Sequence, residues 1–126
     1  MTTIVDADVL IGILRGVTGA QRAVSESRRR SERVISVTPV RTEVLRGMLL
    51  GEEAATSTLL GLLEWVTVDA GLADRAGELA RAYWRSHSGI EIVDLLLAAA
   101  VERFGADLLT RNVRHFPMFP GLHPAY

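Results

Sequence analysis

Four polar side chains stand where the surrounding sequence pattern favours apolar or neutral residues: Asp6, Glu43, Asp94 and Asn112. Asp6 ends a short β-rich run, and Asp94 begins a helical run of leucines and alanines. Each residue has an ordinary structural explanation when taken alone, as a helix cap, a partner of the helix dipole, a solvated helix residue or a turn residue. If the fold brings the three acids together, however, such close like charges need a cation to remain ionised.

Oxygen ligands without histidine or cysteine suit a hard divalent cation, Mg²⁺ or Mn²⁺. A metal held in this way activates water and stabilises the charge on a phosphate that undergoes in-line attack. The chain has no cysteine, which excludes disulfides, thiolate nucleophiles and cysteine-rich zinc sites. His87, His115 and His123 share no ligand spacing, and a structural role is expected of His115. The acids therefore favour metal-dependent phosphate chemistry.

Short β-rich runs alternate with helical patterns along the whole chain. Strands are expected at residues 2–5, 34–37, 66–68 and 107–110, and helices at 7–15, 18–30, 39–50, 52–65, 72–85 and 91–104. Thr38 is expected to cap the third helix, Gly51 to end it and Gly105 to end the last helix. This alternation predicts a parallel sheet covered on both faces. Asp6 and Asn112 would follow two strands at their carboxyl ends, where such sheets bind ligands.

The composition predicts a single domain over residues 1–126, with 48% apolar residues to form a core. No secretory signal and no apolar stretch of membrane-spanning length is present, and a cysteine-free chain suits a reducing cytoplasm. The net charge of −1 gives no general attraction to nucleic acid, so RNA binding would need a local patch. The densest basic patch is Arg28–Arg30 with Arg33, read either as a solvated helix end or as a phosphate-binding surface.

Four stretches carry a resemblance to a known family, and their order and spacing cover nearly the whole chain. They are Ile4–Ile11 (IVDADVLI), Val40–Leu45 (VRTEVL), Asp94–Ala100 (DLLLAAA) and Leu109–Phe116 (LTRNVRHF). With them the sequence resembles a PIN domain, specifically a VapC-type toxin. The resemblance implies a PIN-like three-layer α/β/α sandwich, with a short and mainly parallel sheet of four to five strands between helices.

The resemblance also assigns roles to site residues. It makes Asp6, Glu43 and Asp94 ligands of Mg²⁺, for which Mn²⁺ could substitute, and places Asn112 where many relatives carry a fourth acid. Asn112 contributes no charge. Two supporting residues follow: Thr110, similar to the hydroxyl residue that supports this site, and Glu91, one helical turn before Asp94. Asp8 is expected to be a capping or surface residue, and Asp107 to start a strand.

The implied activity is hydrolysis of RNA phosphodiester bonds by the toxin of a VapBC toxin–antitoxin system, which inhibits translation and growth when free of antitoxin. The implied partners are a VapB-like antitoxin, RNA and a second copy of the chain, in a homodimer and a toxin–antitoxin hetero-oligomer. Arg111 and Arg114 flank Asn112 and could hold RNA near the site. Seven apolar residues could form core or line a groove for an antitoxin helix: Leu10, Ile13, Leu14, Leu49, Leu50, Leu59 and Leu63.

Other functions remain open at this stage. Asp6-x-Asp8 after a strand also resembles the opening of a haloacid-dehalogenase-like phosphatase, with Asp6 as nucleophile and Asp8 as general acid. That chemistry, like that of a response-regulator receiver, usually enlists a lysine, and the chain has none. A PIN-like module that binds RNA or a partner without cleaving it would fit the neutral Asn112. A nuclease of RNA processing without an antitoxin is a further alternative.

Overall fold

Four short strands form a parallel sheet at the centre of the molecule: β1 (Thr2–Val5), β2 (Arg33–Val37), β3 (Glu64–Val66) and β4 (Asp107–Leu109). The computed structural model describes residues 1–126. The strand order is β3-β2-β1-β4, so the chain moves outward from β1 on one side and then crosses to β4 on the other. The carboxyl ends of β1 and β4 thus form the topological switch point, where open α/β sheets bind ligands.

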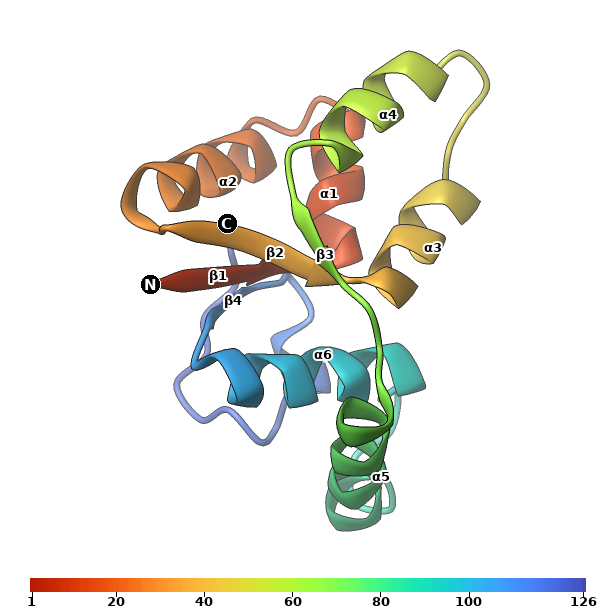
Figure 1. Cartoon of the computed structure of the whole chain (residues 1–126), viewed down its shortest axis with the longest axis vertical. Helices are drawn as coiled ribbons and strands as arrows, with labels where there is room; N and C mark the ends of the chain where they lie inside the picture. The colour runs from red at the N-terminus through yellow and green to blue at the C-terminus, as the bar shows by residue number, and fades with distance from the viewer.

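Helices cover both faces of this sheet, as Figure 1 shows. In chain order they are α1 (Ala7–Leu14), α2 (Thr18–Arg30), α3 (Thr38–Arg46), α4 (Glu53–Leu60), α5 (Ala70–Tyr83) and α6 (Ile92–Phe104), followed by a 3₁₀ turn, η1 (Val113–His115). In the view of Figure 1, α1, α2 and α4 lie above the sheet, and α6 lies below it with α5 packed against it. The predicted parallel sheet between two helical layers is therefore confirmed.

Helix α6 is the buried centre of the lower layer. Every residue from Leu95 to Val101 is buried, because β1 and β2 pack against the helix on one side and α5 on another. This explains why its sequence is apolar nearly all round rather than along one stripe. The helix ends at Gly105, whose φ of 57° lies in the left-handed region, as predicted for a C-cap. None of the helices is both long and apolar enough to cross a membrane.

Several element boundaries differ from the sequence prediction. Helix α4 ends at Leu60 rather than at residue 65, because Trp65 turns back to donate a hydrogen bond from Nε1 to Leu60 O, and α5 spans Ala70–Tyr83 rather than 72–85.

Tertiary contacts explain two further differences. Helix α3 ends at Gly47 rather than running to residue 50, and the following turn is held by Glu52, which accepts hydrogen bonds from Leu49 N and Arg15. Strand β3 lies at 64–66 rather than 66–68, where Glu64 pairs with Arg33 on the neighbouring strand at 2.8 Å. The two arginines lie far from their partners in sequence, Arg15 by 37 positions from Glu52 and Arg33 by 31 positions from Glu64, so local pattern could not place these boundaries.

The start of α3 also differs from the prediction. Val37, not Thr38, is the N-cap residue, and no side chain caps this helix. Pro39 still occupies the first turn, where the missing backbone N–H does not matter.

The burial of α6 makes a prediction about stability. Leu97 is fully buried at its centre, so Leu97→Ala should lower the free energy of unfolding by roughly 2–5 kcal/mol, through lost burial and a cavity. Urea denaturation measures this, with Leu50→Ala as the control because Leu50 is 99% exposed. Equal losses in the two variants would contradict the placement of α6 in the core.

Candidate active site

A cleft of about 280 Å³ opens beyond the carboxyl ends of β1 and β4, at the switch point of the sheet. Ten residues line it: Asp6, Ala7, Asp8, Ile11, Glu43, Arg46, Glu91, Asp94, Asn112 and His115. Five of them were singled out from the sequence as site residues, namely Asp6, Glu43, Glu91, Asp94 and Asn112. The fold therefore brings together residues that lie more than 100 positions apart in the chain.

Asp6 is buried at the floor of this cleft, directly after β1. Its Oδ1 accepts a hydrogen bond from Ala7 N at 2.7 Å and so caps α1. Its Oδ2 accepts from the Thr110 hydroxyl at 2.8 Å, and Thr110 is itself fully buried after β4. The backbone N–H of Asp6 donates to Leu109 O at 2.9 Å. Two adjacent strands thus fix this carboxylate, and Thr110 supports it from beneath.

Asp94 enters the cleft from the first turn of α6. Its Oδ2 accepts a hydrogen bond from Glu91 N at 2.9 Å, in the manner of a capping box, and lies 3.2 Å from His115 Nδ1. Its Oδ1 makes no hydrogen bond to another residue. Asp94 therefore has the structural role at a helix N-terminus considered for it from the sequence, and it also presents a carboxylate oxygen to the cleft.

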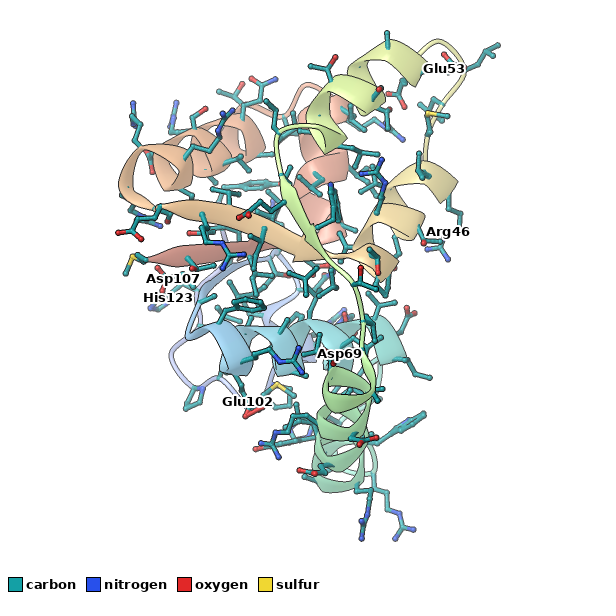
Figure 2. All side chains as sticks on the ribbon, viewed as in Figure 1. Arg46, Glu53, Asp69, Glu102, Asp107 and His123 are labelled. Carbon is teal, nitrogen blue, oxygen red and sulfur yellow. The ribbon has the colours of Figure 1, made fainter.

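Helix α3 closes the side of the cleft with Glu43, as expected, and with Arg46, which the sequence did not single out. The two side chains are an i,i+3 pair, with Arg46 NH2 3.7 Å from Glu43 Oε2. Arg46 is the only basic residue besides His115 that lines the cleft. Figure 2 shows its side chain projecting from α3 at the edge of the molecule. The i,i+3 spacing from Glu43 was the one signal that could have found it.

Asp8 is the second functional candidate that the sequence analysis missed, because the first turn of a helix is an ordinary place for an acid. It is half-buried and lines the cleft rather than the outer surface. Its Oδ2 accepts a hydrogen bond from Arg111 N at 2.8 Å, whereas its Oδ1 is buried without any hydrogen-bond partner. An orphaned carboxylate oxygen inside a cleft is a position that a cation would satisfy.

Arg111 and Arg114, expected to hold RNA near the site, do not line the cleft. The guanidinium of Arg111 lies over the Tyr126 ring, 4.6 Å from its centroid, and the backbone of Arg111 supports Asp8. Arg114 belongs to the η1 turn and is exposed. Within the lining of the cleft, Arg46 is the residue with a guanidinium available for an anion.

The surroundings of the cleft disfavour the charged form of its carboxyl groups. Burial raises the pKa of Asp6 from 3.8 to about 7, and the charges of Asp8 and Asp94 add to this effect while hydrogen bonds from Thr110 and Ala7 oppose it. Burial is also the main cause that raises the pKa of Asp8, Glu43 and Asp94. Poor solvation and mutual repulsion act in the same direction, so the free energy of this site falls if a cation enters it.

The donor set fits a hard divalent cation in its chemistry, with five carboxylates and the amide of Asn112 around one cleft. The unpartnered Asp8 Oδ1 points to the same conclusion. No three of the histidine, aspartate and glutamate side chains already converge as the ligands of one ion do. Some of these side chains must therefore turn inwards for an ion to be held.

A second cavity of about 380 Å³ extends the cleft along α3. It shares Glu43, Arg46 and Glu91 with the cleft and adds the residues Thr38, Pro39, Thr42 and Val93. The two cavities thus form one open groove with acids at its inner end and hydroxyl groups along its wall. Such a groove has room for an extended substrate rather than only a small molecule.

The chain matches known proteins over nearly its full length. Residues 3–119 match the PIN domain family. The chain is 40% identical over 123 residues to Ribonuclease VapC19 of Mycobacterium tuberculosis, and this match covers 98% of both chains. Among solved structures, a toxin–antitoxin complex from Klebsiella pneumoniae aligns with a TM-score of 0.78 at 19% identity, covering 98% of each chain. VapBC2 from Rickettsia felis, bound to a DNA fragment from its promoter, aligns at 0.77 and 20% identity, covering 97% of this chain and 96% of that one.

The two structural matches show the same fold, and the sequence matches go further because they extend through the four stretches that surround the cleft. The resemblance seen in the sequence alone is confirmed: this chain belongs to the PIN-domain family.

Proposed function

We propose that this chain is a divalent-metal-dependent ribonuclease, the toxin of a VapBC-type toxin–antitoxin pair. The observation that carries the proposal is the cleft at the switch point, where four carboxylates with raised pKa values meet. The relative with 40% identity is itself named a ribonuclease, and both structural neighbours are toxin–antitoxin complexes. The proposed substrate is RNA and the proposed location is the cytoplasm. One PIN domain, formed by residues 1–126, would carry the activity.

Asp6, Glu43 and Asp94 would hold the metal, joined by Asp8, with Asn112 as a neutral oxygen donor. Mg²⁺ is our proposal for the ion, and Mn²⁺ a substitute, because both prefer oxygen ligands. When bound, such an ion supplies an activated water and neutralises charge on the phosphate. Thr110 and the N-termini of α1 and α6 hold the carboxylates in place through hydrogen bonds.

Arg46 is proposed to bind the phosphate backbone at the mouth of the cleft. Its side chain is 78% exposed and its pairing with Glu43 is loose at 3.7 Å, so it can exchange this partner for a phosphate oxygen. Thr38 and Thr42 line the adjoining part of the groove and could donate to sugar or phosphate oxygens. Arg28–Arg30 are exposed near the start of β2, at the opposite end of the strands, and are not part of this path.

The antitoxin is proposed to dock in an apolar groove of about 450 Å³ between α1 and α4. The groove is lined by Ile13, Leu14, Ala54, Ala55, Thr58, Leu59 and Leu62. Of the seven apolar residues considered from the sequence, Ile13, Leu14 and Leu59 line this groove. Leu10 and Leu63 are core, whereas Leu49 and Leu50 are exposed. An amphipathic helix is the partner that such a groove accepts. A homodimer within a larger toxin–antitoxin complex completes the proposal.

Cleavage of RNA tests the proposal directly. The purified chain, free of partner, should cut cellular RNA at discrete sites with Mg²⁺ or Mn²⁺ and not with EDTA. Asp94→Asn keeps the size of the side chain but removes its charge. It should lower the cleavage rate by at least about 100-fold, because loss of a residue that only supports a metal ligand already costs up to about that much. Asp107→Asn is the matched control, because Asp107 begins β4 at the far end of the sheet (Figure 2).

Retained RNA binding with no cleavage by the folded wild type would instead favour a binding module that does not cut. An Asp94→Asn variant as active as Asp107→Asn would remove Asp94 from the site.

The raised pKa of Asp6 predicts how stability depends on pH in the metal-free protein. Between pH 3.8 and about 7 the unfolded state loses the Asp6 proton while the folded state keeps it, so unfolding becomes easier as pH rises. Asp6→Asn removes this effect and should raise the stability in EDTA at pH 8, by at most about 4 kcal/mol. Thermal unfolding from pH 4 to 8 measures the difference. Added Mn²⁺ should stabilise the wild type and leave Asp6→Asn unchanged.

A variant less stable than the wild type at every pH would show that the Asp6 carboxylate is not strained in the metal-free fold.

The neighbouring positions of Asp8 and Asn112 predict a compensating pair. If the two share one coordination sphere, Asp8→Asn should weaken Mn²⁺ binding roughly ten-fold. Adding Asn112→Asp should restore it, because the negative charge returns to the cleft at the adjacent side chain. Calorimetric titration of the single and double variants measures this. Wild-type Mn²⁺ affinity in Asp8→Asn would exclude Asp8 as a ligand, and a double variant that binds no better than Asp8→Asn would show that Asn112 does not share its coordination sphere.

A further inference from the structure

Tyr126 packs against the two helices that begin the chain, far from it in sequence. Its ring lies on the backbones of Gly12 in α1 and Gly19 in α2. A Cβ at Gly12 would lie 2.7 Å from the Tyr126 hydroxyl oxygen, and one at Gly19 would lie 2.9 Å from the ring carbons. Real Cβ atoms do not approach so closely, so a side chain at Gly19 would displace the ring, and one at Gly12 would force the hydroxyl to shift.

The Tyr126 ring also contacts Arg111. The Arg111 guanidinium carbon lies 4.6 Å from the Tyr126 ring centroid, within the range of a cation–π interaction. One residue earlier, Ala125 N donates a hydrogen bond to Thr110 O at 2.9 Å. The tail therefore holds the segment Thr110–Arg111 at two points, through one backbone bond and one stacked side chain.

The segment Thr110–Asn112 donates the hydrogen bonds that hold residues of the cleft. Arg111 N donates to Asp8 Oδ2 at 2.8 Å, and the Thr110 hydroxyl donates to Asp6 Oδ2 at 2.8 Å. Asn112 N in turn donates to the Thr110 hydroxyl oxygen at 3.0 Å. Three residues that line the cleft, Asp6, Asp8 and Asn112, thus depend on one short segment. A shift of that segment would move all three.

We propose that Tyr126 and Arg111 form a clamp that positions the segment Thr110–Asn112, and with it Asp8 and Asp6, for metal binding. Tyr126 is a positioning residue, since it lies outside the lining of the cleft. This positioning role is additional to the RNA-binding role expected for Arg111, which stays a prediction. The proposal rests on the proposed function for its consequence in catalysis, whereas the positioning itself is independent of any activity.

Hydrogen exchange at the Arg111 amide tests the positioning in the metal-free protein. Tyr126→Ala should speed this exchange at least about ten-fold, because the bond to Asp8 then opens more often. Tyr126→Phe should exchange like the wild type, since the tyrosine hydroxyl makes no hydrogen bond in the structure. Trp84→Ala is the control for loss of an aromatic ring, because Trp84 is 55% exposed at the C-cap of the distant helix α5.

Metal affinity tests the consequence. Tyr126→Ala should weaken Mn²⁺ binding about ten-fold, as for other residues that orient metal ligands, and Tyr126→Phe should restore it. Leu79→Ala, in the buried face of α5, supplies a variant destabilised away from the cleft. It should keep the affinity of the wild type, which separates positioning from a general loss of stability. Arg111→Gln keeps the backbone donor but removes the stack, and it replaces Tyr126→Ala if that variant fails to fold.

Wild-type exchange at Arg111 in a folded Tyr126→Ala or Arg111→Gln variant would overturn the clamp. Equal losses of Mn²⁺ affinity in Leu79→Ala and Tyr126→Ala would overturn it as well. If the wild type binds no Mn²⁺ and cuts no RNA, the proposed function fails, and the exchange rates alone still decide whether the clamp exists.

Discussion

Repulsion between carboxylates in a poorly solvated cleft is the constraint on which the rest of this structure depends. Five acids line the cleft where β1 and β4 end, and burial raises the pKa of four of them, Asp6, Asp8, Glu43 and Asp94. The fold tolerates them because three of these four lie at helix N-termini, Asp6 and Asp8 at α1 and Asp94 at α6. Backbone N–H groups and the positive ends of the helix dipoles stabilise negative charge there.

The structural and functional explanations of these acids are therefore not alternatives. Asp6 caps α1 through one oxygen, and Asp94 accepts the backbone N–H of Glu91 in a capping arrangement. The same hydrogen bonds fix the orientation of each carboxylate, and both residues line the cleft. These hydrogen bonds offset only part of the free-energy cost of ionising the two carboxyl groups, since the pKa values of Asp6 and Asp94 stay raised. A cation would offset the remainder, which links the stability of the fold to the proposed metal.

The sequence predicted the central acids of the site, Asp6 and Asp94, better than the residues and boundaries around them, for a physical reason. Asp6 and Asp94 interrupt apolar patterns, and strands whose carboxyl ends share one edge must bring such residues together. Asp8 was misjudged because an acid in a first helical turn is common, and only the position of Arg111 N shows that it faces inwards. The end of α3 was misplaced because the Arg15–Glu52 ion pair that orders the next turn spans 37 positions.

The tail shows the limit of local pattern most clearly. No periodicity in residues 112–126 indicates that Tyr126 lies on Gly12 and Gly19, because the signal is spread over glycines more than 100 positions away. Each of those glycines alone looks like a tolerated helix residue. The close approach of Tyr126 gives both glycines a reason, and the ring of the same tyrosine stacks with the exposed Arg111 guanidinium.

Helix α1 connects the two surfaces that the proposed function uses. Its first residues, with Asp6 and Asp8, line the cleft, whereas Ile13 and Leu14 at its end line the apolar groove beside α4. The helix has only eight residues, so a rigid-body shift at one end must reach the other. A partner helix seated in the groove would thus press on the element that carries two of the five carboxylates.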